Sequence, residues 1–216
     1  CGAYVDPGEP DESKLGPDEV FGHARAEKLE DGHSYYLGVC KYNENEKLMF
    51  INGEPHKDAK GVYPYYMSES QVTSETDLLN CATVTVDYVD DTHFTLQISK
   101  SGATNDGKYI SIYTAVSSFG KNVLSINCAS AVGDKFDDGK GHLSDCNYNF
   151  EWIDNYHGYA CQTAAIVMLD DRNEETASPK FFGTGGEYVS MDCKSYSEAF
   201  ADDYNFAYFY EVEAAE

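Results

Sequence analysis

The chain has 216 residues, of which 38 are acidic and 15 are Lys or Arg, so its formal net charge at pH 7 is −23. This length is sufficient for one domain with a full hydrophobic core, or for one domain with an extension. The negative charge excludes nucleic acid, anionic membrane surfaces and free phosphate as default partners, because each of them would be repelled.

Short segments with strand character follow an acidic, turn-rich stretch at residues 1–34. The expected strands are Ser34–Cys40, Ala82–Tyr88, Thr92–Ser99, Tyr109–Val116 and Asn122–Cys128. Asn52-Gly53 predicts a hairpin turn within the polar stretch 41–61, and Asn105-Asp106-Gly107 predicts the turn before Tyr109. Short strands at this spacing favour an all-β fold, either an antiparallel sandwich or a flattened barrel of two antiparallel sheets.

The most distinctive expected strand follows Cys146. Tyr148, Phe150 and Trp152 alternate along it, so they share one face of a strand. Cys161 closes the segment on its other side. A cysteine at each end indicates a strand held in a disulfide-stabilised β-domain.

The chain changes character after residue 163, where it becomes acidic and rich in tyrosine. We expect an apolar strand at Ala164–Leu169 and an aromatic strand at Tyr204–Glu213. The aromatic strand must pair with its own sheet or with the edge of another molecule. The sequence therefore predicts a β-domain at 1–163 and a C-terminal extension at 164–216.

The seven cysteines contain no Cys-x-x-Cys pair, so we expect disulfides and no metal site. Disulfides predict an oxidising location: secreted, extracellular or in the lumen of the secretory pathway. The chain starts at Cys1 without an apolar leader, from which we expect a signal peptide to have been removed. The odd cysteine predicts a free thiol or an intermolecular bond.

The pattern Cys-x-Tyr-x-Phe-x-Trp followed by Ala-Cys, at residues 146–161, resembles the mannose-6-phosphate receptor homology (MRH) domain. The strands that end at Cys40 and Cys128 are similar to further parts of that family. The resemblance covers about residues 1–163 and implies a flattened β-barrel that binds carbohydrate. It also implies disulfides between Cys1 and Cys40 and between Cys128 and Cys161. Cys146 has Cys81 and Cys193 as alternative partners.

The resemblance also implies a sugar site with four types of side chain: Gln, Arg, Glu and Tyr. Tyr148 matches the tyrosine, Gln71 the glutamine, and Asp138 is the acid nearest the glutamate position. The arginine position holds Gly120, with Lys121 beside it. Lysine lacks the planar two-pronged donor of arginine, so we expect weak or atypical binding of a neutral sugar and no strong binding of mannose 6-phosphate.

Other functional motifs are weaker. The loop 134–145 has acids at its first, fifth and twelfth places and glycine at its sixth, like an EF-hand, but Phe136 occupies a ligand place. A solvated loop is favoured, with calcium binding as the alternative. The six histidines are scattered and no Gly-x-Ser-x-Gly motif occurs, so we expect no enzymatic activity and no cofactor.

Two functions are compatible with these patterns. The leading hypothesis is a non-enzymatic, MRH-like module that recognises a glycan or glycoprotein. The alternative is an extracellular structural protein that has lost its sugar site. Such a protein would self-associate, or bind another protein, through β-edges such as Phe206–Val212.

Overall fold

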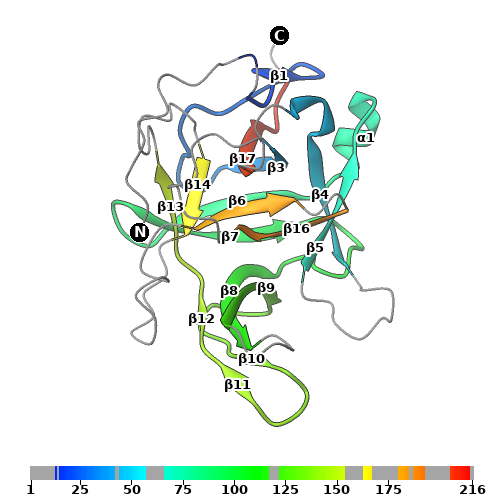
Figure 1. Ribbon diagram of the computed structural model, residues 1–216. Helices are drawn as coiled ribbons and strands as arrows, with labels where there is room; N and C mark the ends of the chain where they lie inside the picture. Colours follow the sequence, from blue (N-terminus) through cyan, green and yellow to red (C-terminus); the bar gives the residue numbers. More distant parts are fainter. Residues whose placement is uncertain are drawn as a thin grey trace, which may run out of the picture.

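The computed structural model describes residues 13, 15–41, 44–56, 66–116, 122–153, 163–166, 180–184, 187–192 and 205–214 (Figure 1). These residues form mainly antiparallel strands with short helical segments. In chain order the elements are β1 (Glu19–Val20), β2 (His23–Ala24), β3 (Ser34–Lys41), η2 (Asn45–Lys47), β4 (Met49–His56), β5 (Tyr66–Gln71), α1 (Glu75–Leu79), β6 (Thr83–Tyr88), β7 (His93–Ser99), β8 (Tyr109–Val116), β9 (Asn122–Ala129), β10 (Phe136–Asp137), β11 (Leu143–Ser144), β12 (Cys146–Asn147), β13 (Phe150–Ile153), β14 (Thr163–Ile166), β15 (Lys180–Thr184), β16 (Tyr188–Asp192) and β17 (Asn205–Glu211). Within these described ranges, no helix is long and apolar enough to cross a membrane.

Most strands belong to one antiparallel sheet, which branches. Its order is β12-β8-β7-β13-β14-β15-β16-β5-β4-β3-β17, while β6 pairs with β3 and β7, and β9 pairs with β8. β3 pairs with β6 at Ser34–Tyr36 and with β4 at Gly38 and Val39. The all-β, antiparallel prediction is therefore confirmed, but within the described residues none of the sheets closes into the predicted barrel.

The strands expected from sequence alternation are confirmed with small shifts of their ends. β3, β6, β7, β8 and β9 each begin and end within one residue of the predicted bounds. The predicted hairpin at Asn52-Gly53 is wrong. Gly53 lies inside β4 with a φ of 85°, where the register against β5 shifts between Ile51 and Pro55. A glycine within a strand pattern here marks a β-bulge instead of a turn.

Strands on both sides of the predicted boundary at residue 163 pair in the same sheet. β14 pairs with β13, and β16 pairs with β5. β17 pairs with β3 along its whole length, from Asn205 opposite Lys41 to Glu211 opposite Tyr35. The aromatic strand near the C-terminus is therefore paired with its own sheet.

β3 and β17 are buried on both faces. One face contributes Tyr35, Leu37, Val39, Ala207 and Phe209 to the main core. The other face contributes Tyr36, Cys40, Tyr208 and Tyr210 to a second core beside Leu15, Leu48 and Phe50. This double burial explains why both segments are almost continuously apolar or aromatic.

The segment at residues 15–26 covers the outer edge of β17. The backbone N–H of Ala26 donates to the carbonyl of Phe209 at 2.7 Å, and Nδ1 of His23 donates to the carbonyl of Glu211 at 2.9 Å. The hydroxyl of Tyr210 donates to the carbonyl of Pro17 at 2.8 Å. We call β3, β17 and this covering segment the closed region.

Candidate functional site

Tyr148, the best match to the family's sugar-binding tyrosine, is bonded to its own chain. Its side chain is 5% exposed, and its hydroxyl donates to the backbone carbonyl of Asp134 at 2.6 Å. Burial and, to a smaller extent, the nearby Cys146 raise the pKa of Tyr148 to about 12. The hydroxyl is therefore neutral and already engaged in a hydrogen bond.

Asp138 stabilises the tip of the β10–β11 hairpin. Its carboxylate accepts hydrogen bonds from the backbone N–H groups of Lys140 at 2.7 Å and His142 at 3.1 Å, and lies 3.0 Å from the His142 ring. These donors lower the pKa of Asp138. Of the described residues, no group of three or more His, Cys, Asp or Glu side chains is placed to hold a metal ion.

The predicted sugar-site residues are not gathered into one cluster. Gln71 is the exposed last residue of β5, and α1 follows it closely in the chain. Figure 1 shows α1 at the top of the view and the hairpin that carries Asp138 at the bottom. Lys121 lies outside the described residues.

The predicted disulfides are not shown. The cysteines in the described ranges are free thiols: Cys40, Cys81, Cys128 and Cys146. Burial raises the pKa of both Cys40 and Cys128 to about 12, so these thiols are neutral. Their expected partners Cys1 and Cys161 lie outside the described residues, so both bonds stay predictions.

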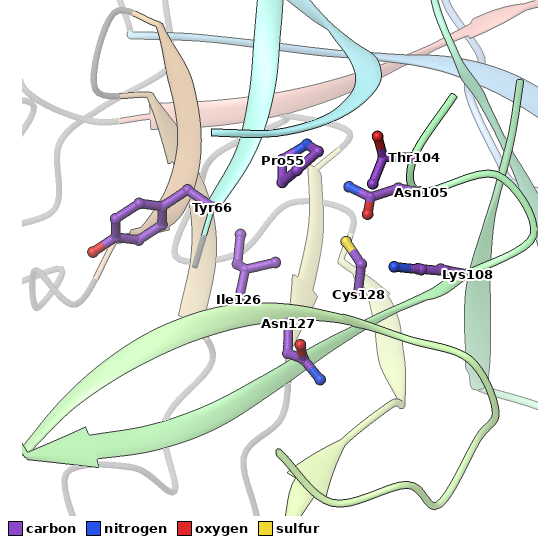
Figure 2. Close-up of a pocket in the computed structure, with 8 residues that line it drawn as sticks. All are labelled: Pro55, Tyr66, Thr104, Asn105, Lys108, Ile126, Asn127 and Cys128. Atoms are coloured by element: carbon purple, nitrogen blue, oxygen red, sulfur yellow. The ribbon is translucent and has the colours of Figure 1, made fainter. Parts of the chain in front are cut away.

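A pocket of about 180 Å³ lies between β4, β5, β9 and the turn that leads into β8 (Figure 2). It is lined by Pro55, Tyr66, Thr104, Asn105, Lys108, Ile126, Asn127 and Cys128. In Figure 2 the amide of Asn105, the ammonium end of Lys108 and the sulfur of Cys128 point toward one another. The side chain of Asn127 points away from them.

The pocket exists because the turn before β8 docks on the bulge of β4. The backbone N–H of Asn105 donates to the carbonyl of Gly53 at 2.9 Å, and the N–H of Thr104 donates to the Glu54 carboxylate at 3.1 Å. A Cβ at Gly53 would lie 2.9 Å from the Cβ of Ala103. Only glycine combines this close approach with the positive φ of 85° at Gly53.

Two polar side chains of the pocket have no partner within the described part of the chain. Asn105 is 4% exposed, yet its side-chain amide forms no hydrogen bond there, although its backbone is bonded. Lys108 is half-buried and its ammonium forms no ion pair there. Neither side chain is bonded within the described residues, so both groups are available for a ligand or for water.

The chemical character of the side chains that line the pocket suits the binding of a ligand and not catalysis. Burial holds the thiol of Cys128 neutral despite the opposing influence of Lys108, so it is a poor nucleophile. No His, Asp or Glu is among the pocket residues that the structure describes. What these side chains offer is a set of hydrogen-bond donors and acceptors beside apolar surface from Pro55 and Ile126.

Sequence reasoning identified Asn105-Asp106-Gly107 as a turn, which is confirmed, but missed its role in a pocket. The Asp106 carboxylate accepts from the N–H of Lys100 at 2.8 Å, and the N–H of Gly107 donates to the carbonyl of Ile98 at 2.8 Å. These bonds satisfy the turn without the Asn105 amide. The docking of this turn on β4 has no local signal in the sequence.

Comparison with known proteins identifies no relative. No family model, no curated protein and no solved structure matches this chain. Its function therefore has to be inferred from its own residues and their geometry.

Proposed function

We propose that this chain is a non-enzymatic carbohydrate-recognition module of the secretory pathway or extracellular space, and that the pocket beside Asn105 binds the sugar. The observation that carries the proposal is the side-chain amide of Asn105. Asn105 as a residue is 4% exposed and lies in the pocket wall, and its amide lacks a hydrogen bond within the described part of the chain. An amide both donates and accepts hydrogen bonds, as the hydroxyl groups of a sugar do.

The remaining walls fit a small polar ligand with an apolar face. Pro55 and Ile126 offer apolar surface for the C–H groups of a sugar ring. Tyr66 is fixed in place because its ring stacks on Tyr188, with centroids 4.7 Å apart. The volume of about 180 Å³ is below the ~300–1,000 Å³ of pockets for drug-sized ligands, so it suits roughly one sugar unit.

The MRH-like assignment belongs to the same proposal. It rests on the sequence pattern at residues 146–161, and the antiparallel β architecture is compatible with it. The proposed bond between Cys128 and Cys161 would fix the pocket wall to which Cys128 belongs. Peptide mapping without reductant tests this bond, and finding either cysteine bonded elsewhere rejects it.

A glycan array on the purified chain tests the proposal, with three variants that separate the pocket from the family's site. We expect specific binding that is lost in Asn105→Ala. Tyr148→Phe and Asn149→Ala should retain it; Asn149 is an exposed asparagine outside the pocket lining and serves as the matched control. If Tyr148→Phe loses glycan binding and Asn105→Ala retains it, the sugar site is the one implied by the MRH resemblance and not the pocket. Silence across the array would reject carbohydrate recognition.

Self-association through the C-terminal strand is the alternative. The segment expected to mediate it, Phe206–Val212, largely coincides with β17, which pairs with β3 on one edge. On the other edge, Phe209 and Glu211 accept hydrogen bonds from the covering segment. An assembly role would therefore have to use another edge, and the mass of the purified protein in solution would show the assembly directly.

A further inference from the structure

Lys108 differs from four other lysines whose side-chain contacts are known. Lys28, Lys47 and Lys135 form ion pairs with carboxylates at 3.6, 3.1 and 3.1 Å. The ammonium of Lys100 donates to the carbonyl of Asn80. Lys108 forms no ion pair in the described ranges, although the chain has 38 acidic residues. The ammonium of Lys108 is therefore not neutralised by an ion pair with a carboxylate of the described residues.

The position of Lys108 couples it to the amide of Asn105. The backbone N–H of Lys108 donates to the backbone carbonyl of Asn105 at 3.1 Å, so one tight turn carries both side chains. Figure 2 shows both side chains directed into the same pocket. An ammonium has three donors and an amide NH₂ has two, so together they can bind two neighbouring oxygen atoms of one group.

The single positive charge of the pocket lining is suited to a ligand with one negative charge. Lys108 is the only charged side chain in the lining that the structure describes. A carboxylate carries one negative charge, whereas a phosphate monoester carries about 1.5–2 at pH 7. The excess charge of a phosphate would have no cation to meet it in this lining. A carboxylate is therefore the better match for one ammonium and one amide.

The net charge of −23 does not prevent this binding. At physiological ionic strength, exposed charges are screened beyond about 8 Å, so distant carboxylates act weakly on a bound anion. Among the described lining residues the half-buried Lys108 carries the only charge, while the nearby Glu54 carboxylate is already bonded to Thr104. Hydrogen bonds between charged groups are roughly twice as strong as neutral ones, so Lys108 can determine which sugar is preferred.

We propose that the pocket prefers a sugar that carries a carboxylate, such as a uronic acid, and that Lys108 is the residue that determines this preference. The ammonium of Lys108 binds one carboxylate oxygen, and the NH₂ group of Asn105 binds the other oxygen or a neighbouring hydroxyl. This inference rests on the proposed carbohydrate function and specifies the class of sugar.

Calorimetric titrations with matched ligands test the inference. Glucuronate and glucose share a ring and differ in a carboxylate, galacturonate and galactose form a second pair, and glucose 6-phosphate supplies the phosphate arm. We expect each uronate to bind about tenfold or more tightly than its parent hexose. Lys108→Gln should remove the preference, Lys108→Arg should retain it, and Lys28→Gln, with the same loss of charge at an exposed site, should leave it unchanged.

The outcomes separate this inference from the function on which it rests. If each hexose binds as tightly as its uronate, or if Lys108→Gln keeps the preference, the carboxylate inference is wrong and the carbohydrate function stands. Tighter binding of glucose 6-phosphate than of glucuronate overturns the charge argument. If no sugar binds the wild-type chain, both proposals fail. Thermal unfolding of each variant confirms that the compared proteins are folded.

Discussion

The closed region and the pocket differ in how their polar side chains are bonded, although Nε2 of His23 in the closed region also forms no hydrogen bond within the described residues. In the closed region, the Tyr210 hydroxyl donates to the carbonyl of Pro17 at 2.8 Å, and His23 donates to the carbonyl of Glu211 at 2.9 Å. In the pocket, Asn105 is 4% exposed and its side-chain amide has no such partner within the described residues. Lys108 beside it has no ion pair there.

This difference is the basis of the proposed function. Folded proteins satisfy nearly all of their buried polar groups, because an unsatisfied one costs roughly 1–3 kcal/mol. The aromatic residues of β17 are conspicuous in the sequence, but the structure buries them in the hydrophobic core. The asparagine and lysine of an ordinary-looking turn are polar groups that the fold leaves available at a pocket. The predictions below test this contrast, beginning with the largest effect.

Truncation within β17 should show that the closed region is a core. Phe209 is fully buried, and its ring lies 6.1 Å from the rings of Tyr35 and Trp152. Phe209→Ala should lower the free energy of unfolding by about 3–5 kcal/mol, because it removes apolar contacts and leaves a cavity. Denaturant unfolding measures the loss.

Leu143 supplies the control, because its side chain is 64% exposed in the β10–β11 hairpin. Leu143→Ala should change the free energy of unfolding by no more than about 0.5 kcal/mol. A similarly small loss for Phe209→Ala would mean that β17 is a detachable extension and not part of the core.

Glu69 is intermediate between the bonded polar groups of the closed region and the unbonded ones of the pocket, because only one of its two carboxylate oxygens has a hydrogen bond. It is 5% exposed on β5, accepts a hydrogen bond from the Thr184 hydroxyl at Oε1, and has no partner at Oε2. Burial raises the pKa of Glu69 from 4.5 to about 7. The folded state therefore binds a proton more tightly than the unfolded state does.

The sign of the effect on stability follows from this difference. Below pH 4.5 both states are protonated, and as the pH rises from 4.5 to about 7 the unfolded state loses its proton first. Stability should thus fall across this window, by up to roughly 3 kcal/mol from Glu69, and then level off. Glu69→Gln should remove this component and stabilise the protein at pH 8. Parallel pH profiles for the two proteins would disprove the assignment.

The sequence predicted the strands whose neighbours are nearby or whose pattern is strong. β6 and β7 alternate clearly and are joined by a tight turn in which Asp90 accepts from the N–H groups of Thr92 and His93. β3 and β17 were predicted because both segments are rich in aromatic residues. The structure accounts for this composition, because both strands are buried on both faces. Local pattern was sufficient for these elements.

Elements that depend on distant contacts were missed. β4 contains Gly53, which has the signature of a hairpin turn and becomes a bulge only because the turn at Asn105 docks on it. The pocket is formed by the same docking, so no short motif could reveal it. α1 did have a local signal: Ser74 accepts from the N–H of Asp77 as an N-cap residue.

Removal of one hydroxyl should have a moderate effect in the closed region. Tyr210→Phe keeps the buried ring but leaves the carbonyl of Pro17 without its donor. The free energy of unfolding should fall by about 0.5–1.5 kcal/mol, the usual net contribution of a hydrogen bond. Thermal unfolding at fixed pH measures it, and an unchanged midpoint would show that the bond contributes nothing to the closed region.

Asn105→Ala should have the smallest effect on stability, although Asn105 is nearly as buried as Tyr210. The Asn105 amide has no hydrogen bond to lose within the described residues. The backbone bond from Asn105 to Gly53 remains, so the turn stays docked. We expect a change in the free energy of unfolding of less than about 0.5 kcal/mol, measured under the same conditions as for Tyr210→Phe. A loss as large as that of Tyr210→Phe would show that the amide stabilises the fold. A negligible loss together with abolished ligand binding would show that the fold buries Asn105 for its ligand.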